Sequence, residues 1–551
     1  MKPDRFAQMT NASSGSSAVG DVAAGQSQNP YLALFVVCFG LVIVVLDNSI
    51  LNIAIPALSR DLNASTSDLQ WIVDSYTLVY AGTMLTAGSL GDRLGRRRSV
   101  MWGVGCFGAA SAIASLATSS TVLIVSRGLM GLCAAFITPA SLSIVTNLFH
   151  DPRERARAIG IWAAVSSTGA AAGPVLGGIL LEHFWWGSVF LVNVPIAVAL
   201  VMLTPLFVPE SRDPRPARLD PIGAALSIAA LSALLWATIA GPDHGWTSRP
   251  ILVGYAIGIV LTASFILWEL NRTDPMLDLG FFRNPAFSAA TLANMAMVMA
   301  WSGTAFIFVQ LLQSVLGYSP LEAGLRLAPF AIVGAFGGLF GPPLAARIGR
   351  KKAICLGLGT EGIGSALLFT YHLSGGYTTA AIYMTIFSAG QSVVFSQAIA
   401  SVMDSVPREK SGVASGANNT CRQLGLAFGV ALGGSILASR YRSELSTRTA
   451  SLGLDEATLD QAGKSIASAV EVSSEIPGAA GDGLLSAARD AFVPAMHSAM
   501  LFAVVMCVLG IAVTAIWLPD HRATLSHAQG NDDVNDVQRR DGESDGDDTQ
   551  R

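Results

Sequence analysis

Long apolar runs alternate with short polar links along nearly the whole chain, from residue 31 to residue 518. Each run holds at least 20 residues, and an α-helix of about 20 residues spans the ~30 Å hydrocarbon core of a membrane. The pattern therefore predicts an all-α membrane protein. The fourteen expected membrane-spanning helices cover residues 31–55, 69–90, 99–119, 122–146, 157–181, 187–208, 221–241, 251–270, 287–314, 321–346, 353–374, 377–403, 411–438 and 492–518.

The amino-acid composition supports this interpretation. Of 551 residues, 52% are hydrophobic and only 13% are charged, and the mean hydropathy is +0.51, which is not the balance of a soluble protein. The net charge is −4 and the basic residues lie in short loops, so no nucleic-acid partner is expected. The six cysteines lie singly in apolar runs, so the sequence predicts neither disulfides nor a metal site.

The positions of the basic residues predict the orientation of the chain in the membrane. Eighteen lysines and arginines lie in the short loops on one side, and only Arg60 and Arg249 lie in the short loops on the other side. Since short loops rich in Lys and Arg stay in the cytoplasm, both termini are predicted to be cytoplasmic. The compositions of residues 1–30 and 520–551 predict disordered cytoplasmic tails, the second of them acidic.

Two short patterns occur twice at nearly the same spacing. Arg93–Arg98 recurs as Arg347–Lys352 at an offset of 254 residues, and Pro152–Arg155 recurs as Pro407–Lys410 at an offset of 255. Such an internal duplication is typical of secondary transporters, in which two helical bundles move about a site between them. The repeat therefore predicts two related membrane bundles.

The duplication accounts for twelve of the fourteen helices, because the pair near the middle of the chain has no second copy. We therefore expect one six-helix bundle at residues 31–210, two inserted helices at 211–284, and a second six-helix bundle at 285–519. Residues 440–491 are rich in Ser, Ala and Gly and are expected to form an external loop with one surface helix.

The most strongly charged link is Gly88–Arg98, here called the latch loop. Its glycines let two helix ends approach closely, and its carboxylate can bind an arginine or the N-terminus of a helix. The loop can therefore hold helices together and release them, although an isolated basic loop of this kind is more often a topology signal. Its candidate residues are Gly88, Gly91, Asp92, Arg93, Gly95, Arg96 and Arg97.

Three ionisable residues lie inside the expected spans, where a charge costs from about 2.5 kcal/mol upward and is functional by default. Counting residues from the helix ends places Asp47, Asp74 and Arg127 in the outer half of the membrane. Two carboxyl groups near one guanidinium can exchange a proton when the helices move, because burial and the arginine act on them in opposite senses. The alternative is a purely structural ion pair.

The fifth span contains small residues at helical spacing, which allow close contact between helices. Its candidate residues are Gly169, Gly173, Pro174, Gly177 and Gly178, and the proline removes one backbone hydrogen bond, so a bend is expected there.

Other polar residues within the spans have two possible roles, since they either line a cavity or hold helices together. The candidate cavity-lining residues are Asn48, Asn294, Trp301, Gln310, Gln313, Gln391 and Gln397. The charged residues expected to be structural are Glu361, Arg422, Glu322 and Arg326, of which the last two form an i, i+4 pair.

The sequence gives no support to an ATP-driven pump or to an enzyme. Its only Gly-Lys-Ser lies at Gly463–Ser465, and Thr458 stands where the first glycine of a phosphate-binding loop is required. Nucleophile, zinc and redox motifs are also missing from the sequence, so no cofactor is expected. Energy for transport must then come from a gradient.

These motifs resemble the major facilitator superfamily, and within it the fourteen-helix branch of drug:H+ antiporters. The latch loop is similar to the family's cytoplasmic loop, and the resemblance implies that Asp92, Arg93 and Arg96 stabilise the outward-open state. Leu46–Pro56 is similar to the first-helix motif of this branch, Arg127–Gly131 to the motif whose arginine is implied in proton transfer, and Gly169–Gly178 to the antiporter motif. In the second half, Ala346 replaces the aspartate of the latch loop, so an asymmetric latch is expected.

The resemblance implies a proton-coupled multidrug efflux antiporter in the cytoplasmic (inner) membrane of a bacterium, functional as a monomer. Its partners would be protons, the lipid bilayer and a small amphipathic substrate, which buried acids would favour in cationic form. Two alternatives stay open. One is export of a specific endogenous lipid, siderophore or antibiotic, and the other is a receptor or scaffold that has kept the fold without transport.

Overall fold

The computed structural model describes residues 30–149, 151–212, 220–272, 275, 277–406 and 411–519. Over these ranges the chain consists of helices joined by short connections, with no β-strand. The predicted tails lie outside the described residues, apart from Pro30 at the start of the first helix, and so does the repeated segment Pro407–Lys410.

Seven helices form the N-terminal bundle, and the short α6 and α7 together take the place of one predicted span. The bounds are α1 Pro30–Asp61, α2 Thr66–Leu94, α3 Arg96–Ser115, α4 Ser120–Leu148, α5 Pro152–His183, α6 Ser188–Leu191 and α7 Asn193–Phe207. The inserted pair follows as α8 Pro221–His244 and α9 Arg249–Leu270.

The second bundle begins after a short 3-10 helix, η1 Leu279–Arg283, and its first helix ends in a π-helical turn, η2 Leu311–Val315. The remaining elements are α10 Pro285–Gln310, α11 Pro320–Ile348, α12 Arg350–Phe369, η3 Leu373–Gly375, α13 Gly376–Asp404, α14 Ser411–Thr449, α15 Glu456–Lys464, α16 Ile466–Glu475 and α17 Ala479–Trp517.

Eleven helices within the described residues are long and apolar enough to cross a membrane. The three other predicted spans correspond to α2, α3 and α5, which have 29, 20 and 32 residues and are therefore also long enough, but they are less apolar. A multi-pass membrane protein is confirmed, whereas the count of fourteen spans stays a prediction.

Local sequence explains where several helices begin and end. A capping box starts α2, since Ser65 and Asp68 each accept a hydrogen bond from the other's backbone N–H. Gly95, at φ +115°, separates α2 from α3 in a conformation that favours glycine. We expected α1 to end near Pro56, but it continues to Asp61, so Asp47 lies near the middle of a 32-residue helix.

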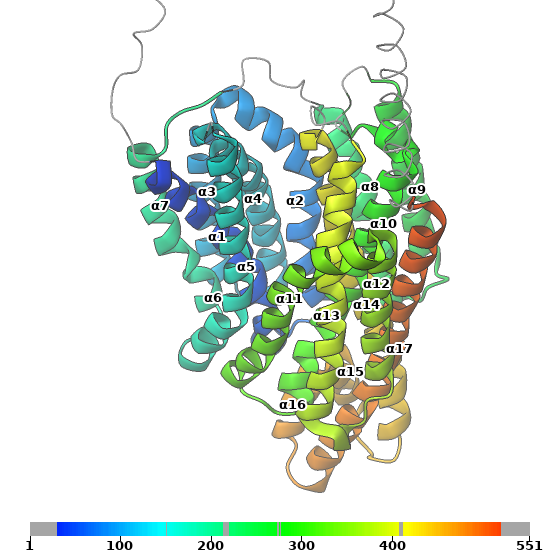
Figure 1. The fold of residues 1–551 in the computed structure, drawn as a ribbon. Coiled ribbons are helices and arrows are strands. Elements are labelled where there is room, and N and C mark those ends of the chain that lie inside the picture. Colours follow the sequence, from blue (N-terminus) through cyan, green and yellow to red (C-terminus); the bar gives the residue numbers. More distant parts are fainter. Residues whose placement is uncertain are drawn as a thin grey trace, which may run out of the picture.

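The two bundles stand side by side with their helices along a common direction (Figure 1). We call the end that carries the α2–α3 and α11–α12 connections the basic face, and the end that carries α15 and α16 the far face. The bundles contact each other along α2 and α14 and along α5 and α11. A continuous apolar core includes residues of both bundles, such as Ile72 of α2 and Phe306 of α10.

Residues 440–491 contain more helix than the sequence predicts. α14 continues to Thr449, α17 begins at Ala479, and α15 and α16 lie between them. Both short helices are capped, because Asp455 accepts a hydrogen bond from the N–H of Thr458 and Ser465 accepts one from the N–H of Ser468. The Ser465 hydroxyl also lies 2.7 Å from the Ser59 hydroxyl, so this segment packs on the end of α1.

Candidate proton and substrate site

Asp47 and Arg127 form a fully buried ion pair inside the N-terminal bundle. Arg127 of α4 donates from Nη1 to Oδ2 of Asp47, and from Nη2 to Oδ1 of Asn48 at 3.3 Å. The residues Asp47 and Arg127 are 2% and 0% exposed. The structure therefore joins two of the three ionisable residues that the sequence singles out.

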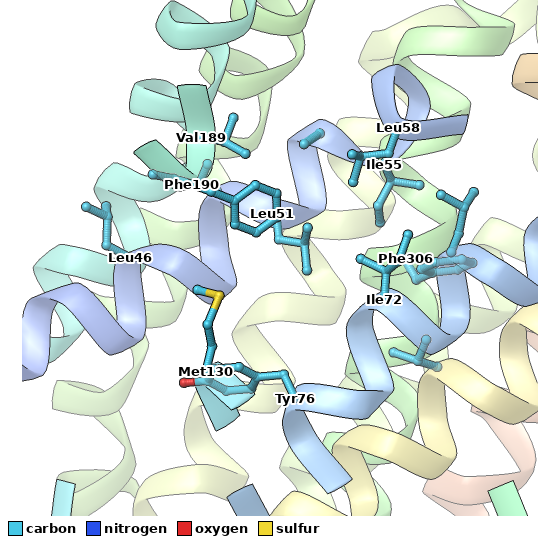
Figure 2. Close-up of a cluster of buried hydrophobic side chains, with 14 of the residues drawn as sticks. Leu46, Leu51, Ile55, Leu58, Ile72, Tyr76, Met130, Val189, Phe190 and Phe306 are labelled. Carbon is cyan, nitrogen blue, oxygen red and sulfur yellow. The ribbon is translucent and has the colours of Figure 1, made fainter. Parts of the chain in front are cut away.

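The backbone of α2 approaches α4 closely enough to complete the arginine's surroundings. Gly131 makes this possible, because a Cβ there would lie 2.3 Å from the carbonyl oxygen of Tyr76. Arg127 donates from Nε to the carbonyl oxygen of Ile72 at 3.1 Å, and its guanidinium lies 4.3 Å from the centre of the Tyr76 ring. Figure 2 shows the apolar packing around this point, with Tyr76 beside Met130.

A second donor reaches the other oxygen of Asp47. Asn193, the first residue of α7, donates from Nδ2 to Oδ1 of Asp47 at 2.8 Å and lies 3.1 Å from the Ser111 hydroxyl. Sequence reasoning missed Asn193, Ser111 and Tyr76. The signal for Asn193 was present, because it is a buried amide in an otherwise apolar run. Both oxygens of Asp47 thus accept a hydrogen bond, and these bonds and the arginine's charge favour the ionised form of the carboxyl group.

Asp74 does not join this group, contrary to our expectation. It lies one turn from Gln70 and one turn from Leu78 on a face of α2 that points away from Ile72 and Arg127. Gln70 donates to the carbonyl oxygens of Val430 and Ala431 in α14 at 3.1 and 2.7 Å. The helical period thus places Asp74 between the bundles, away from the arginine.

Asp74 is also unusual in its polar contacts. It is 0% exposed, and neither carboxylate oxygen has a hydrogen-bond partner among the described residues. Leu78, on the same face, packs with Leu235 and Ile239 of α8 and with Ala427 and Ala431 of α14. A carboxyl group in such a place can take up a proton without breaking an existing contact.

The segment predicted as the latch loop is mostly helical, since α2 continues to Leu94 and α3 begins at Arg96, and it contacts its own bundle. Asp92 accepts a hydrogen bond from Arg96 at 2.7 Å, and Glu210, just beyond α7, lies 3.8 and 3.7 Å from Arg97 and Arg98. Glu210 also accepts from the N–H of Arg97 at 3.2 Å. Sequence reasoning missed Glu210, because an acidic residue in a polar connection carries no signal of its own. These contacts anchor the segment to the end of α7 that lies at the basic face.

The latch is asymmetric in the structure, as the sequence predicts. In the second half the loop has Ala346 instead of an aspartate, and Arg350 pairs with Asp404 at the end of α13 at 2.6 Å. The first-half aspartate bonds within its own loop, whereas the second-half arginine bonds to a neighbouring helix of its bundle. The two loops therefore hold different elements.

The small residues of α5 bring the two bundles into close backbone contact. A Cβ on Gly178 would lie 2.6 Å from the Cα of Leu321, and a Cβ on Gly324 would lie 2.2 Å from the carbonyl oxygen of Pro174. Gly173 likewise faces Ser49 of α1 within its own bundle. The antiporter-like segment therefore lets α5 meet the first turns of α11 and closes the far face.

We predict that Gly324→Ala forces α5 and α11 apart, because the added methyl group meets backbone and no flexible side chain that could yield. The variant should fold but should close its far face poorly and lose most transport. Disulfide cross-linking of cysteines introduced into the far ends of α5 and α11 measures the closure. Gly334→Ala in the same helix is the control, since a Cβ there meets nothing within 4 Å, and equal loss in both variants would contradict the prediction.

The expected cavity-lining residues separate into two groups. Asn48 and Gln313 take part in contacts near the site, and Gln313 crosses the bundle boundary by donating to the carbonyl oxygen of Ile53 at 2.9 Å. The others make their contacts mainly within the second bundle. Asn294 donates to Asn418, Gln310 donates to a carbonyl oxygen of its own helix, and Gln397 donates to Ser396. Trp301 packs against the apolar core, and Gln391 is half-buried.

The charged residues expected to be structural differ in whether they have polar partners among the described residues. Arg326 lies 3.6 Å from Glu322 and stacks 3.7 Å from the centre of the Tyr318 ring. Arg422 donates to Asn419, whose amide lies 2.9 Å from the sulfur of Met84 in α2. Glu361 is 0% exposed and, within the described part of the chain, both of its carboxylate oxygens lack a hydrogen-bond partner.

Sequence comparison identifies related proteins over most of the chain. Residues 37–430 match the Major Facilitator Superfamily. The multidrug efflux pump LfrA of Mycolicibacterium smegmatis is 37% identical over 88% of this chain and 96% of the relative. The methyl viologen resistance protein SmvA of Salmonella typhimurium is 32% identical over 84% of this chain and 93% of the relative. The tetracenomycin C resistance and export protein of Streptomyces glaucescens is 30% identical over 91% of this chain and 94% of the relative.

Solved structures share the fold at low sequence identity. A bacterial homolog of the human lysosomal transporter Spinster, in an inward-facing and unoccupied conformation, has a TM-score of 0.64 at 18% identity, over 90% of this chain and 98% of that chain. The xylose transporter XylE of E. coli has a TM-score of 0.55 at 12% identity, over 90% and 98%.

The similarities confirm the predicted all-α membrane fold and the prediction of a transporter instead of an enzyme. The family match, the length over which the relatives align and the shared bundle architecture agree, and the chain belongs to the Major Facilitator Superfamily of membrane transporters.

Proposed function

We propose that the protein is a proton-coupled multidrug efflux antiporter of the bacterial cytoplasmic membrane. In this proposal fourteen helices span the membrane, the basic face is cytoplasmic, and a monomer suffices for transport. The substrate is a small amphipathic compound, preferably cationic. The names of the relatives, which include a multidrug efflux pump and a methyl viologen resistance protein, support this substrate class.

The observation that carries the proposal is the place of Asp74. It is a fully buried carboxyl group without a polar partner, on the face of α2 that packs against the other bundle. Closing the far face around an ionised carboxylate costs from about 2.5 kcal/mol upward, so closure favours a bound proton. A proton taken up from the far side would therefore accompany closure, and cargo entering from the basic face would displace it.

The Asp47–Arg127 pair has a different role in this proposal. Because both oxygens of Asp47 accept hydrogen bonds, the pair holds α1, α4 and α7 together while the far face is closed. Asn48 and Tyr76, which contact the guanidinium, connect the pair to the neighbouring faces of α1 and α2. A shift of α2 would then change the surroundings of Arg127 and couple the pair to the movement of the bundles.

For a neutral cargo, the membrane potential supplies a sufficient driving force for efflux. One proton that moves down a potential of 100 mV releases about 2.3 kcal/mol. At roughly 1.4 kcal/mol for each factor of ten, exchange of one proton for one neutral molecule could sustain roughly a fortyfold concentration gradient.

The test is proton release from purified protein reconstituted into liposomes. Addition of an organic cation such as methyl viologen or tetraphenylphosphonium should move protons against the cation, and a pH-sensitive dye inside the vesicles reports them. An uncoupler should collapse a cation gradient that the protein has built. Measurable cation binding without proton movement, across a broad panel of compounds, would contradict antiport.

A second candidate is export of one specific endogenous antibiotic or lipid. The 30% identity to a tetracenomycin C resistance and export protein over 91% of this chain favours it. The same assay separates the two functions, because a dedicated exporter would respond to a single compound and a multidrug pump to many.

A further inference from the structure

The inserted helix α8 ends in a carboxylate that contacts both bundles at once. Asp243 accepts a hydrogen bond on Oδ2 from the Ser67 hydroxyl of α2 at 2.8 Å. Its other oxygen, Oδ1, accepts one from Nη2 of Arg442 in α14 at 2.8 Å. α2 belongs to the first bundle and α14 to the second, so this single side chain connects the two halves of the protein.

Backbone carbonyl oxygens at the end of α8 also contact both α2 and α14. Arg442 lies 3.4 Å from the carbonyl oxygen of Pro242, and the Ser67 hydroxyl oxygen also lies 3.2 Å from the carbonyl oxygen of Ile239. Ser435 of α14 donates to the carbonyl oxygen of Thr238 at 2.9 Å. The last turn of α8 therefore offers acceptors to α2 on one side and to α14 on the other.

The rest of α8 is packed between the same two helices. In its first half, the side chain of Ile228 packs on Gly82 of α2, where a Cβ would lie 2.4 Å from Cγ1 of that isoleucine. Leu235 and Ile239 share a buried cluster with Leu78 of α2 and Ala431 of α14. This helix has no counterpart in the internal repeat, so its contacts are additions to the two-bundle plan.

We propose that the end of α8, through Asp243, Ser67 and Arg442, is a clamp that holds the far face closed and must open in each transport cycle. It rests on the proposed alternation of the two bundles, but on neither the cargo nor the proton. When α2 and α14 separate at the far face, Asp243 cannot remain bonded to both Ser67 and Arg442. The inserted pair of helices thereby sets the balance between the two states.

The clamp is weak enough to open repeatedly. The side chains of Asp243 and Arg442 are 35% and 43% exposed, so water and salt reach the ion pair. Pairs of this kind contribute modestly and are screened by salt. Loss of the clamp should therefore shift the ratio of open to closed far faces by about two- to fivefold, without unfolding the protein.

The experiment measures the distance between spin labels at Glu182 of α5 and Leu325 of α11, which are exposed near the far face. It uses the full-length protein in lipid nanodiscs, after replacement of the six native cysteines. Asp243→Ala and Arg442→Gln should each increase the fraction with the longer distance. The double variant should add little to either single change, because both break the same contact.

Two further comparisons make the test specific. The charge exchange Asp243→Arg with Arg442→Asp should restore the wild-type distribution, and high salt should open the wild type but not Arg442→Gln. Asp482→Asn removes an exposed acid in the first turn of α17 and is the matched control, which should change nothing. Unchanged distances in Asp243→Ala and Arg442→Gln, or an equal shift in Asp482→Asn, would overturn the clamp.

The result is independent of the proton assay. Label distances that respond to Asp243→Ala in a protein that releases no protons would support the clamp and contradict antiport. Normal proton release together with label distances that do not change in Asp243→Ala would support antiport and contradict the clamp.

Discussion

Asp74→Asn should abolish proton release on addition of a lipophilic cation while the protein still folds and binds the cation. The substitution keeps the shape of the side chain but removes the site for an exchangeable proton. Since Asp74 has no hydrogen-bond partner to lose, folding should be little affected. Exchange of labelled for unlabelled cation across the membrane, which needs no proton, should continue. In liposomes we therefore expect proton release to fall to the background level while cation exchange continues.

Glu361→Gln is the matched control for that experiment. Glu361 is as deeply buried as Asp74 and equally without a partner among the described residues. It lies within the second bundle, where its backbone meets Gly390 of α13, and it does not lie between the bundles. We therefore expect nearly normal proton release from Glu361→Gln. Normal release from Asp74→Asn would exclude Asp74 as the proton site, and complete loss in Glu361→Gln alone would move the site to the second bundle.

Arg127→Ala should cause the largest loss of stability. The substitution leaves the Asp47 carboxylate buried without its cation, and removal of one partner of a buried ion pair costs about 3–5 kcal/mol. It also removes the hydrogen bond to Ile72 and the contact with Tyr76. Thermal unfolding of the purified protein in detergent, followed by tryptophan fluorescence, should show a clearly lower midpoint.

The double variant Asp47→Asn with Arg127→Ala tests the cause. If the stranded charge is responsible, the neutral asparagine should recover part of the loss, so the double variant should be more stable than Arg127→Ala alone. Arg98→Ala controls for removal of an arginine, since that side chain is 60% exposed and its loss should cost no more than about 0.5 kcal/mol. A double variant that is less stable than both single variants would show that the loss has another origin.

Much of the candidate site was predictable because a charge in a lipid-facing run is conspicuous. Asp47 and Arg127 stand out in the sequence for this reason, and they are in contact in the structure. The glycine-rich segment of α5 was also predictable, since small residues at helical spacing mark close helix contacts, and Gly178 meets α11. What the sequence could not provide was the partner of each group.

Asp74 shows how a plausible grouping can fail. Its position in the sequence places it at nearly the same depth as Arg127, but depth does not determine direction. Ile72 and Tyr76 face the arginine, and Asp74 lies on another side of the same helix, toward α14. Glu210 and Asp243 were missed because their importance comes only from the segments that meet around them.

The sequence by itself determined the class of the protein and the residues whose burial carries a cost, and it predicts a division into two related bundles with an inserted pair of helices. These properties follow from hydropathy, spacing and internal repetition, which are local or periodic features of the chain. Only the tertiary structure decided that Asp47 pairs with Arg127 and Asn193, that Asp74 lies alone between the bundles, and that α8 connects both halves. Those contacts join residues that are distant in the chain, and their geometry depends on how the helices rotate and pack.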